Sequence, residues 1–200
     1  MDLVIRAVTA QPIDAHGLDG SFRVESELTL FVEDGVIRYE VISVPPYVKR
    51  YDQQPVGDVS APRTTPDKAV FVASLDRSIA GRIVLSEGWN RQAWIVDLAV
   101  DARRRRAGVG RALMSRAVAW TRERGLAVIR AETQNNNVPA CKLYESCGFR
   151  LGGFDRDLYR GLERGRRRSP SSGIWISGRP PGSPPVRRMR RGLAHDPNPS

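Results

Sequence analysis

Apolar residues in the first half of the chain recur at alternate positions or in short runs, which is the pattern of β-strands with one buried face. Asp34-Gly35 suits a two-residue type I′ turn between two such segments, and Pro45-Pro46 is expected to end the second of them. The pattern predicts strands over residues 3–8, 22–32, 36–44, 68–75, 79–85 and 92–100.

The second half of the chain changes to helical spacing. Val109, Leu113, Ala117 and Trp120 share one helical face, and the glycine at position 125 ends that helix. A further helix is predicted over residues 139–147, and strands over 126–132, 149–152 and 154–159. Strands and helices in this order predict an α/β domain with a mixed, mostly antiparallel sheet that is flanked by helices.

Composition limits the function classes. Two hundred residues with 40% hydrophobic content suit a single domain. Eight arginines and one acid between residues 166 and 200 supply +7 of the formal net charge of +10, so the rest of the chain is nearly balanced. This distribution argues against a specific nucleic-acid partner for the domain. The chain has no apolar run of 18 residues, no secretory signal and no metal-ligand spacing, so we expect a cytoplasmic protein without membrane or metal.

The stretch from Asp101 to Leu113 has the features of an anion-binding loop between a strand and a helix. Gly108 and Gly110 allow the backbone to approach a ligand closely, and Arg105 precedes them by three and five residues. The first backbone N–H groups of the helix have no partner within it and favour an anion. The alternative is a solvated arginine-rich turn with ordinary turn glycines.

A second motif lies downstream, with Asn137 and Ala140 followed by Tyr144, Gly148 and Phe149. Together, the two motifs resemble the GNAT superfamily of N-acetyltransferases, which implies acetyl-CoA as the acetyl donor. The resemblance implies that Tyr144 protonates the leaving thiolate, and that Asn137 contacts the pantetheine arm or caps the following helix. It also implies that backbone and loop groups hold the rest of the donor: Leu98, Val100, Arg105, Arg106, Ala107, Gly108, Val109, Gly110 and Arg111.

Acetyl transfer to an amine also needs a group that accepts the proton of the amine. Asp97 and Glu132 are acids within otherwise apolar strands, where a buried carboxylate is costly unless it is paired or used. The alternative is that strand alternation places either one on a solvated face. The sequence does not choose between them.

Within this superfamily the chain resembles the streptothricin acetyltransferases over about residues 3–161. The resemblance implies acetylation of a primary amine of a streptothricin-type antibiotic, hence antibiotic resistance. Acidic residues occur in segments that we expect near the entrance to the substrate site, where they would attract a cationic small molecule: Asp19, Glu25, Glu27, Glu33, Asp34 and Asp52. Segments that carry the likeness are 18–22, 27–28, 44–47 with Lys49, 88–91, 111–114 and 153–155. The sequence leaves open whether the protein forms a homodimer.

Three other functions stay open. A GNAT enzyme that acetylates another amine or a protein N-terminus would keep the same chemistry. A catalytically impaired acyl-CoA-binding module would keep the glycine loop without needing Tyr144. A nucleic-acid-binding protein driven by its arginine tail is disfavoured, because that tail lacks interleaved aromatic residues for base stacking.

The C-terminal segment departs from the family pattern. Residues 1–165 are interpreted as the acetyltransferase domain, and residues 166–200, with seven prolines and four glycines, as a disordered tail. The family ends in one more apolar strand, which is expected to be missing here. A frameshift near Gly165 would explain its loss: if residues 168–175 use a suitable set of codons, a reading shifted by one base gives a β-branched and aromatic strand, and the nucleotide sequence decides this. Impaired activity would follow.

Overall fold

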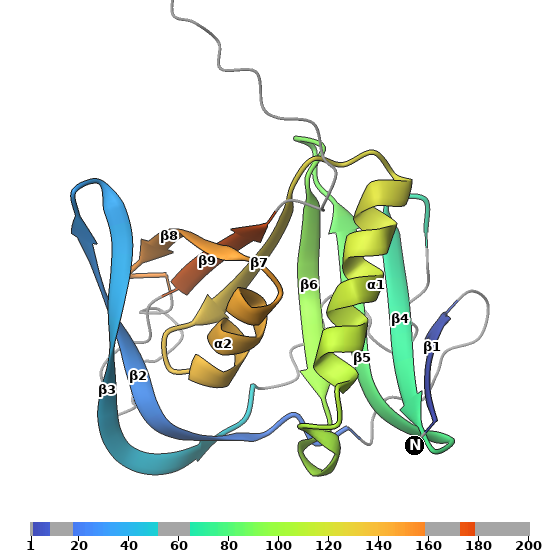
Figure 1. Cartoon of the computed structure of the whole chain (residues 1–200), viewed down its shortest axis with the longest axis horizontal. Helices are drawn as coiled ribbons and strands as arrows, with labels where there is room; N and C mark the ends of the chain where they lie inside the picture. Colours follow the sequence, from blue (N-terminus) through green and yellow to red (C-terminus); the bar gives the residue numbers. More distant parts are fainter. Residues whose placement is uncertain (1, 9–17, 52–64, 159–172, 179–200) are drawn as a thin grey trace, which may run out of the picture.

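The computed structural model describes residues 2–8, 18–51, 65–158 and 173–178. Seven strands form one sheet in the order β1-β4-β5-β6-β7-β9-β8, and β2 and β3 form a separate hairpin beside it (Figure 1). The strands are β1 (Leu3–Ala7), β2 (Phe22–Glu33), β3 (Val36–Lys49), β4 (Lys68–Leu75), β5 (Ser78–Glu87), β6 (Ala93–Val100), β7 (Ile129–Gln134), β8 (Arg150–Asp155) and β9 (Gly173–Gly178). The fold class predicted from the sequence is confirmed.

The short helix η1 (Ala102–Arg104) and the helix α1 (Val109–Glu123) connect β6 to β7. These two strands are parallel, so the chain must cross from one end of the sheet to the other between them. The apolar stripe of α1 faces the sheet: Val109, Leu113, Met114, Ala117 and Trp120 are buried. The second helix, α2 (Val138–Ser146), lies between β7 and the hairpin (Figure 1). No helix in the part of the chain that the structure describes is long and apolar enough to cross a membrane.

The β2–β3 hairpin is longer than the sequence predicts. Asp34 and Gly35 have φ values of 51° and 73°, so the expected type I′ turn is confirmed. The prediction that Pro45-Pro46 ends β3 is wrong, because the strand continues to Lys49. A register shift between Val24 and Ser26 in β2 accommodates both prolines, which have no N–H to give to a ladder.

The prediction that the closing strand is missing is wrong. Residues 173–178 form β9, which inserts between β7 and β8 and pairs antiparallel with both. Ile174 and Ile176 are fully buried there. The predicted domain boundary after Gly165 is therefore wrong, because it leaves out a strand of the sheet. The expectation of impaired activity rested on the absence of this strand, and its presence removes that reason. Residues 159–172 and 179–200, with the rest of the predicted disorder, lie outside the described residues, and the frameshift stays a hypothesis.

Candidate active site

The parallel strands β6 and β7 pair only at their beginnings. Residues 93–95 of β6 align with residues 129–131 of β7, and β6 then continues to Val100 while β7 continues to Gln134. Leu98 and Val100 keep their partners Ile83 and Gly81 on the β5 side. The other side of β6 is not paired with β7 at these positions, so an extended amide-containing ligand can add there as a strand would.

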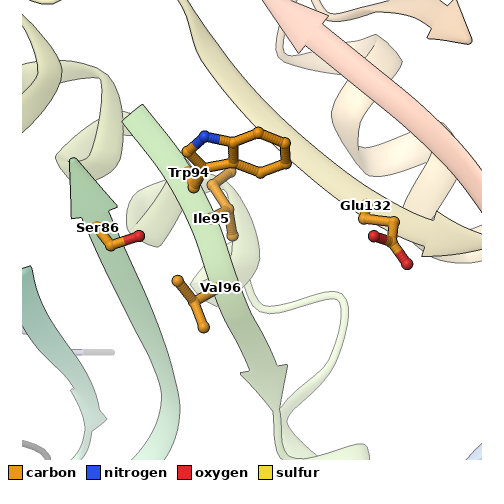
Figure 2. A pocket seen from close by; sticks show the side chains of 5 residues that line it. All are labelled: Ser86, Trp94, Ile95, Val96 and Glu132. Carbon is orange, nitrogen blue, oxygen red and sulfur yellow. The ribbon is translucent and has the colours of Figure 1, made fainter. Parts of the chain in front are cut away.

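A bulge marks the point where the two strands separate. Asp97 aligns with Val84 and Ile95 aligns with Leu85, so Val96 is the extra residue. A pocket of about 430 Å³ lies at this point (Figure 2). Its lining residues are Ser86, Trp94, Ile95, Val96 and Glu132. The cavity thus lies where β6 and β7 separate, and Glu132 is the predicted site residue among those that line it.

The predicted anion-binding loop has the backbone geometry that the sequence suggests. Gly108 has a φ of 81° and is the N-cap of α1, with no side chain to cap the helix. The first helical bond runs from the N–H of Ala112 to the carbonyl of Gly108. The N–H groups of Val109, Gly110 and the following residue therefore precede the first intrahelical bond, which is the arrangement that favours an anion.

Two neighbouring positions of this loop have structural contacts of their own. The side chain of Arg111 donates to the carbonyl and hydroxyl oxygens of Ser146 at 3.4 and 3.3 Å, so it joins α1 to α2 and leaves only its backbone for a ligand. A Cβ atom at Gly110 would lie 3.0 Å from Leu143. This glycine therefore allows the start of α1 to pack closely on α2, a role that the sequence does not reveal.

A buried carboxylate that sequence reasoning missed fixes the beginning of the loop. Asp101 is 2% exposed and accepts from the backbone N–H, Nε and Nη2 of Arg103 at 2.8–2.9 Å, and from the N–H of Asp19 at 3.4 Å. The bonds from Arg103 hold the pKa of the Asp101 carboxyl well below its usual range. Asp101 thus orients the chain where it leaves β6 for the loop of Arg105, Arg106 and Ala107.

Tyr144 lies on α2 and is 4% exposed. Burial raises the pKa of Tyr144 above its ordinary value, and the nearby acidic groups Cys141, Tyr51 and Asp97 raise it further. Its ring lies 5.7 Å from that of Phe149, measured between centroids. The phenol is therefore protonated at neutral pH, as a proton donor must be.

Asn137 is the N-cap of α2. Its Oδ1 accepts from the N–H of Ala140 at 3.2 Å, and its Nδ2 donates to the hydroxyl of Tyr51 at 3.0 Å. The capping role is confirmed. Both polar atoms of the side chain thus have protein partners, and a contact with the pantetheine arm stays a prediction.

The structure separates the two candidate acids. Asp97 accepts from Nε of Arg82 at 2.7 Å and does not line the pocket. Glu132 is exposed and lines the pocket, directly after the last residue of β7 that pairs with β6 (Figure 2). The strand register that places Arg82 beside Asp97 is not visible in the sequence. Within the described residues, no group of three His, Cys, Asp or Glu side chains is arranged for a metal.

Of the acids expected around the entrance, two are neutralised by neighbouring arginines. Glu25 pairs with Arg23 at 2.6 Å, and Glu33 pairs with Arg38 at 2.8 Å. Asp52 lies outside the described residues. An acidic entrance therefore stays a prediction that these ion pairs weaken.

A sheet that opens between two parallel strands, beside a glycine-capped helix and a buried tyrosine, is a fold and site suited to an acyl-CoA-dependent acyltransferase. Residues 37–149 match the acetyltransferase (GNAT) family, and the chain belongs to this family. It is an acyltransferase.

The chain is also similar to particular members of the family. It is 34% identical to a streptothricin acetyltransferase of Escherichia coli, a match that covers 88% of this chain and 95% of the relative. A Bacillus anthracis structure assigned as a streptothricin acetyltransferase, solved with acetyl coenzyme A, has a TM-score of 0.77 at 37% identity. The nourseothricin acetyltransferase structure has a TM-score of 0.71 at 32% identity. Each match covers 90% of this chain and 99% of the solved chain.

Proposed function

We propose that this protein transfers the acetyl group of acetyl-CoA to a primary amine of a streptothricin-type antibiotic and thereby confers resistance. The observation that carries the proposal is the extent of the similarity. The match covers 95% of the E. coli streptothricin acetyltransferase and 99% of the solved B. anthracis chain, so it includes more than the part that a general family member needs to hold its donor. A cytoplasmic location is part of the same proposal.

The residues present fit acetyl-CoA. The unpaired side of β6 at Leu98 and Val100 offers backbone groups to the amides of the pantetheine arm. The N–H groups that follow Gly108 suit the pyrophosphate, and Arg105 and Arg106 add positive charge beside them. The pocket at the strand separation then receives the thioester and the amine.

Glu132 is the residue we assign as the proton acceptor. The amine must lose a proton before its nitrogen bonds to the thioester carbon, and the Glu132 carboxylate, directly or through a water, faces the cavity where this takes place. The carbon–sulfur bond then breaks, and Tyr144 gives its proton to the CoA thiolate. Asp97 accepts from Arg82 and does not line the pocket, so we assign it a structural role.

The test is a thiol-release assay with purified protein, acetyl-CoA and streptothricin. We expect release of CoA that depends on streptothricin and exceeds the release with an alanine-terminated peptide or free lysine. Faster release with the peptide would favour acetylation of protein N-termini. Stabilisation by acetyl-CoA in a thermal-unfolding assay, without turnover of any amine, would favour a binding module.

Two variants test the assignment of the acids. Glu132→Gln should lower kcat by about 10²–10⁴-fold at neutral pH, because it removes the proton acceptor and keeps the shape of the side chain. Asp97→Asn should lower kcat less than Glu132→Gln does. The reverse order would transfer the role of base to Asp97.

A further inference from the structure

The β2–β3 hairpin lies outside the seven-stranded sheet, yet it contacts the segment that carries the candidate proton donor. A backbone hydrogen bond joins β2 to the β7–α2 loop: the N–H of Leu28 donates to the carbonyl of Asn135 at 2.9 Å. The Asn135 side chain donates back to the carbonyl of Leu28 at 3.3 Å. The hairpin therefore joins the loop at a point far from its own strands in sequence.

The end of β3 bonds to the same loop and to the last residue of β7 through alternate residues. The ammonium of Lys49 donates to Oε1 of Gln134 and to Oδ1 of Asn136, the second at 3.2 Å. The hydroxyl of Tyr47 accepts from Nδ2 of Asn136 at 3.0 Å. Residues two apart on a strand share one face, so both side chains point toward the loop.

The amides that Lys49 binds are buried. Gln134 is 9% exposed and Asn136 is 3% exposed. A buried amide oxygen without a donor costs free energy, and a charged donor gives the stronger hydrogen bond. One ammonium that bonds both oxygens therefore fixes the end of β7 relative to the residue that precedes the N-cap of α2.

We propose that Lys49 is a positioning residue for acetyl transfer: it fixes the β7–α2 loop and, through the helix that this loop begins, the hydroxyl of Tyr144. Asn137 caps α2 immediately after the loop, and Tyr144 lies two turns further along the same helix. The inference rests on the proposed function, because it assigns Lys49 to the step in which Tyr144 donates its proton.

The first test is steady-state kinetics of Lys49→Met, which keeps the stem of the side chain and removes its donor. We expect kcat to fall about tenfold to a hundredfold, as misplacement of a catalytic group does, while the KM for acetyl-CoA stays within about twofold. Lys49→Arg should restore most of kcat, because a guanidinium can also donate to two oxygens. Arg38→Met is the matched control: it removes a cation of the same strand whose partner is the exposed Glu33, and kcat should not change.

The second test asks whether Lys49 acts through Tyr144. If it does, Lys49→Met combined with Tyr144→Phe should be no slower than Tyr144→Phe alone, because the group being positioned is already gone. Multiplicative losses in the double variant would overturn the proposal. Lys49 and Tyr47, with their partners Gln134 and Asn136, form a brace between β3 and the β7–α2 loop. If Lys49→Met is too unstable to purify, Tyr47→Phe removes another contact of this brace with little change in volume. Its loss of kcat should be smaller and should likewise disappear in the Tyr144→Phe background.

The third test does not depend on turnover. Amide hydrogen exchange of the unliganded protein should be faster across α2 in Lys49→Met than in wild type, and unchanged in Arg38→Met. Unchanged hydrogen exchange in α2 would overturn the proposed role of Lys49, even if the enzyme is active. Absence of streptothricin turnover by wild type, with faster α2 exchange in the variant, would instead refute the proposed function and leave Lys49 as a structural brace only.

Discussion

Replacing Asp101 with asparagine should destabilise the protein and disturb the loop that is predicted to bind an anion. The buried carboxylate accepts four hydrogen bonds, three of them from Arg103. An asparagine amide keeps one acceptor oxygen and turns an NH₂ group toward donors. The side chain of Arg103 is 77% exposed and can be rehydrated, so its bonds count little in the loss.

The expected decrease in the free energy of unfolding comes mainly from the backbone N–H groups of Arg103 and Asp19, which no longer donate to a full negative charge. Hydrogen bonds to charged groups contribute about 1.5–3 kcal/mol each, and a single unsatisfied buried donor costs about as much. We therefore expect a loss of about 2–3 kcal/mol. For a domain of this size that corresponds to a decrease in Tm of roughly 4–12 °C.

The Tm difference between wild type and Asp101→Asn should decrease at low pH. The pKa of Asp101 is lowered in the folded protein, so its stabilisation is fully present above the unfolded value of about 4 and is lost as the pH falls through the folded pKa. Differential scanning fluorimetry of wild type and Asp101→Asn should show a constant Tm difference between pH 5 and 8. The difference should shrink below pH of about 4.

Asp67→Asn is the matched control, since this exposed carboxylate accepts from the hydroxyl of Thr65 and its loss should leave Tm nearly unchanged. Acetyl-CoA should stabilise Asp101→Asn less than wild type, because the loop then starts from a less ordered position. A Tm equal to that of wild type at pH 7, or a difference that persists undiminished at pH 2, would refute the reasoning.

Three further predictions follow from the site and the sheet. Tyr144→Phe should lower kcat by about 10²–10⁴ with little change in the acetyl-CoA Kd from calorimetry, and unchanged turnover would remove the tyrosine from the mechanism. Gly110→Val should weaken acetyl-CoA binding, because a Cβ there would lie 3.0 Å from Leu143 and displace the start of α1, and unaltered affinity would contradict the loop assignment. Ile176→Ala should cost about 2–5 kcal/mol in a denaturant titration, whereas no loss would show that β9 does not belong to the sheet.

The sequence determined the features that depend on near neighbours in the chain. Asp34-Gly35 forms the expected type I′ turn because only the local backbone decides it. Val109 begins a helix with one apolar face, and Asn137 caps the next helix through an amide three residues away. The backbone geometry of the loop predicted to bind an anion follows for the same reason, since its glycine conformation and helix start lie within a few residues.

Only the tertiary structure decided which distant groups meet. Arg82 neutralises Asp97 because the β5–β6 register places them together, and Lys49 reaches Gln134 across 85 residues of chain. β9 was missed for a related reason: Ile174-Trp175-Ile176 is a short apolar run among glycine, serine and arginine, with no periodicity that outweighs its surroundings. It becomes a strand because β7 and β8 both offer it unpaired backbone and a buried face. Which strands pair depends on segments that are far apart in the chain, so the local sequence does not predict it.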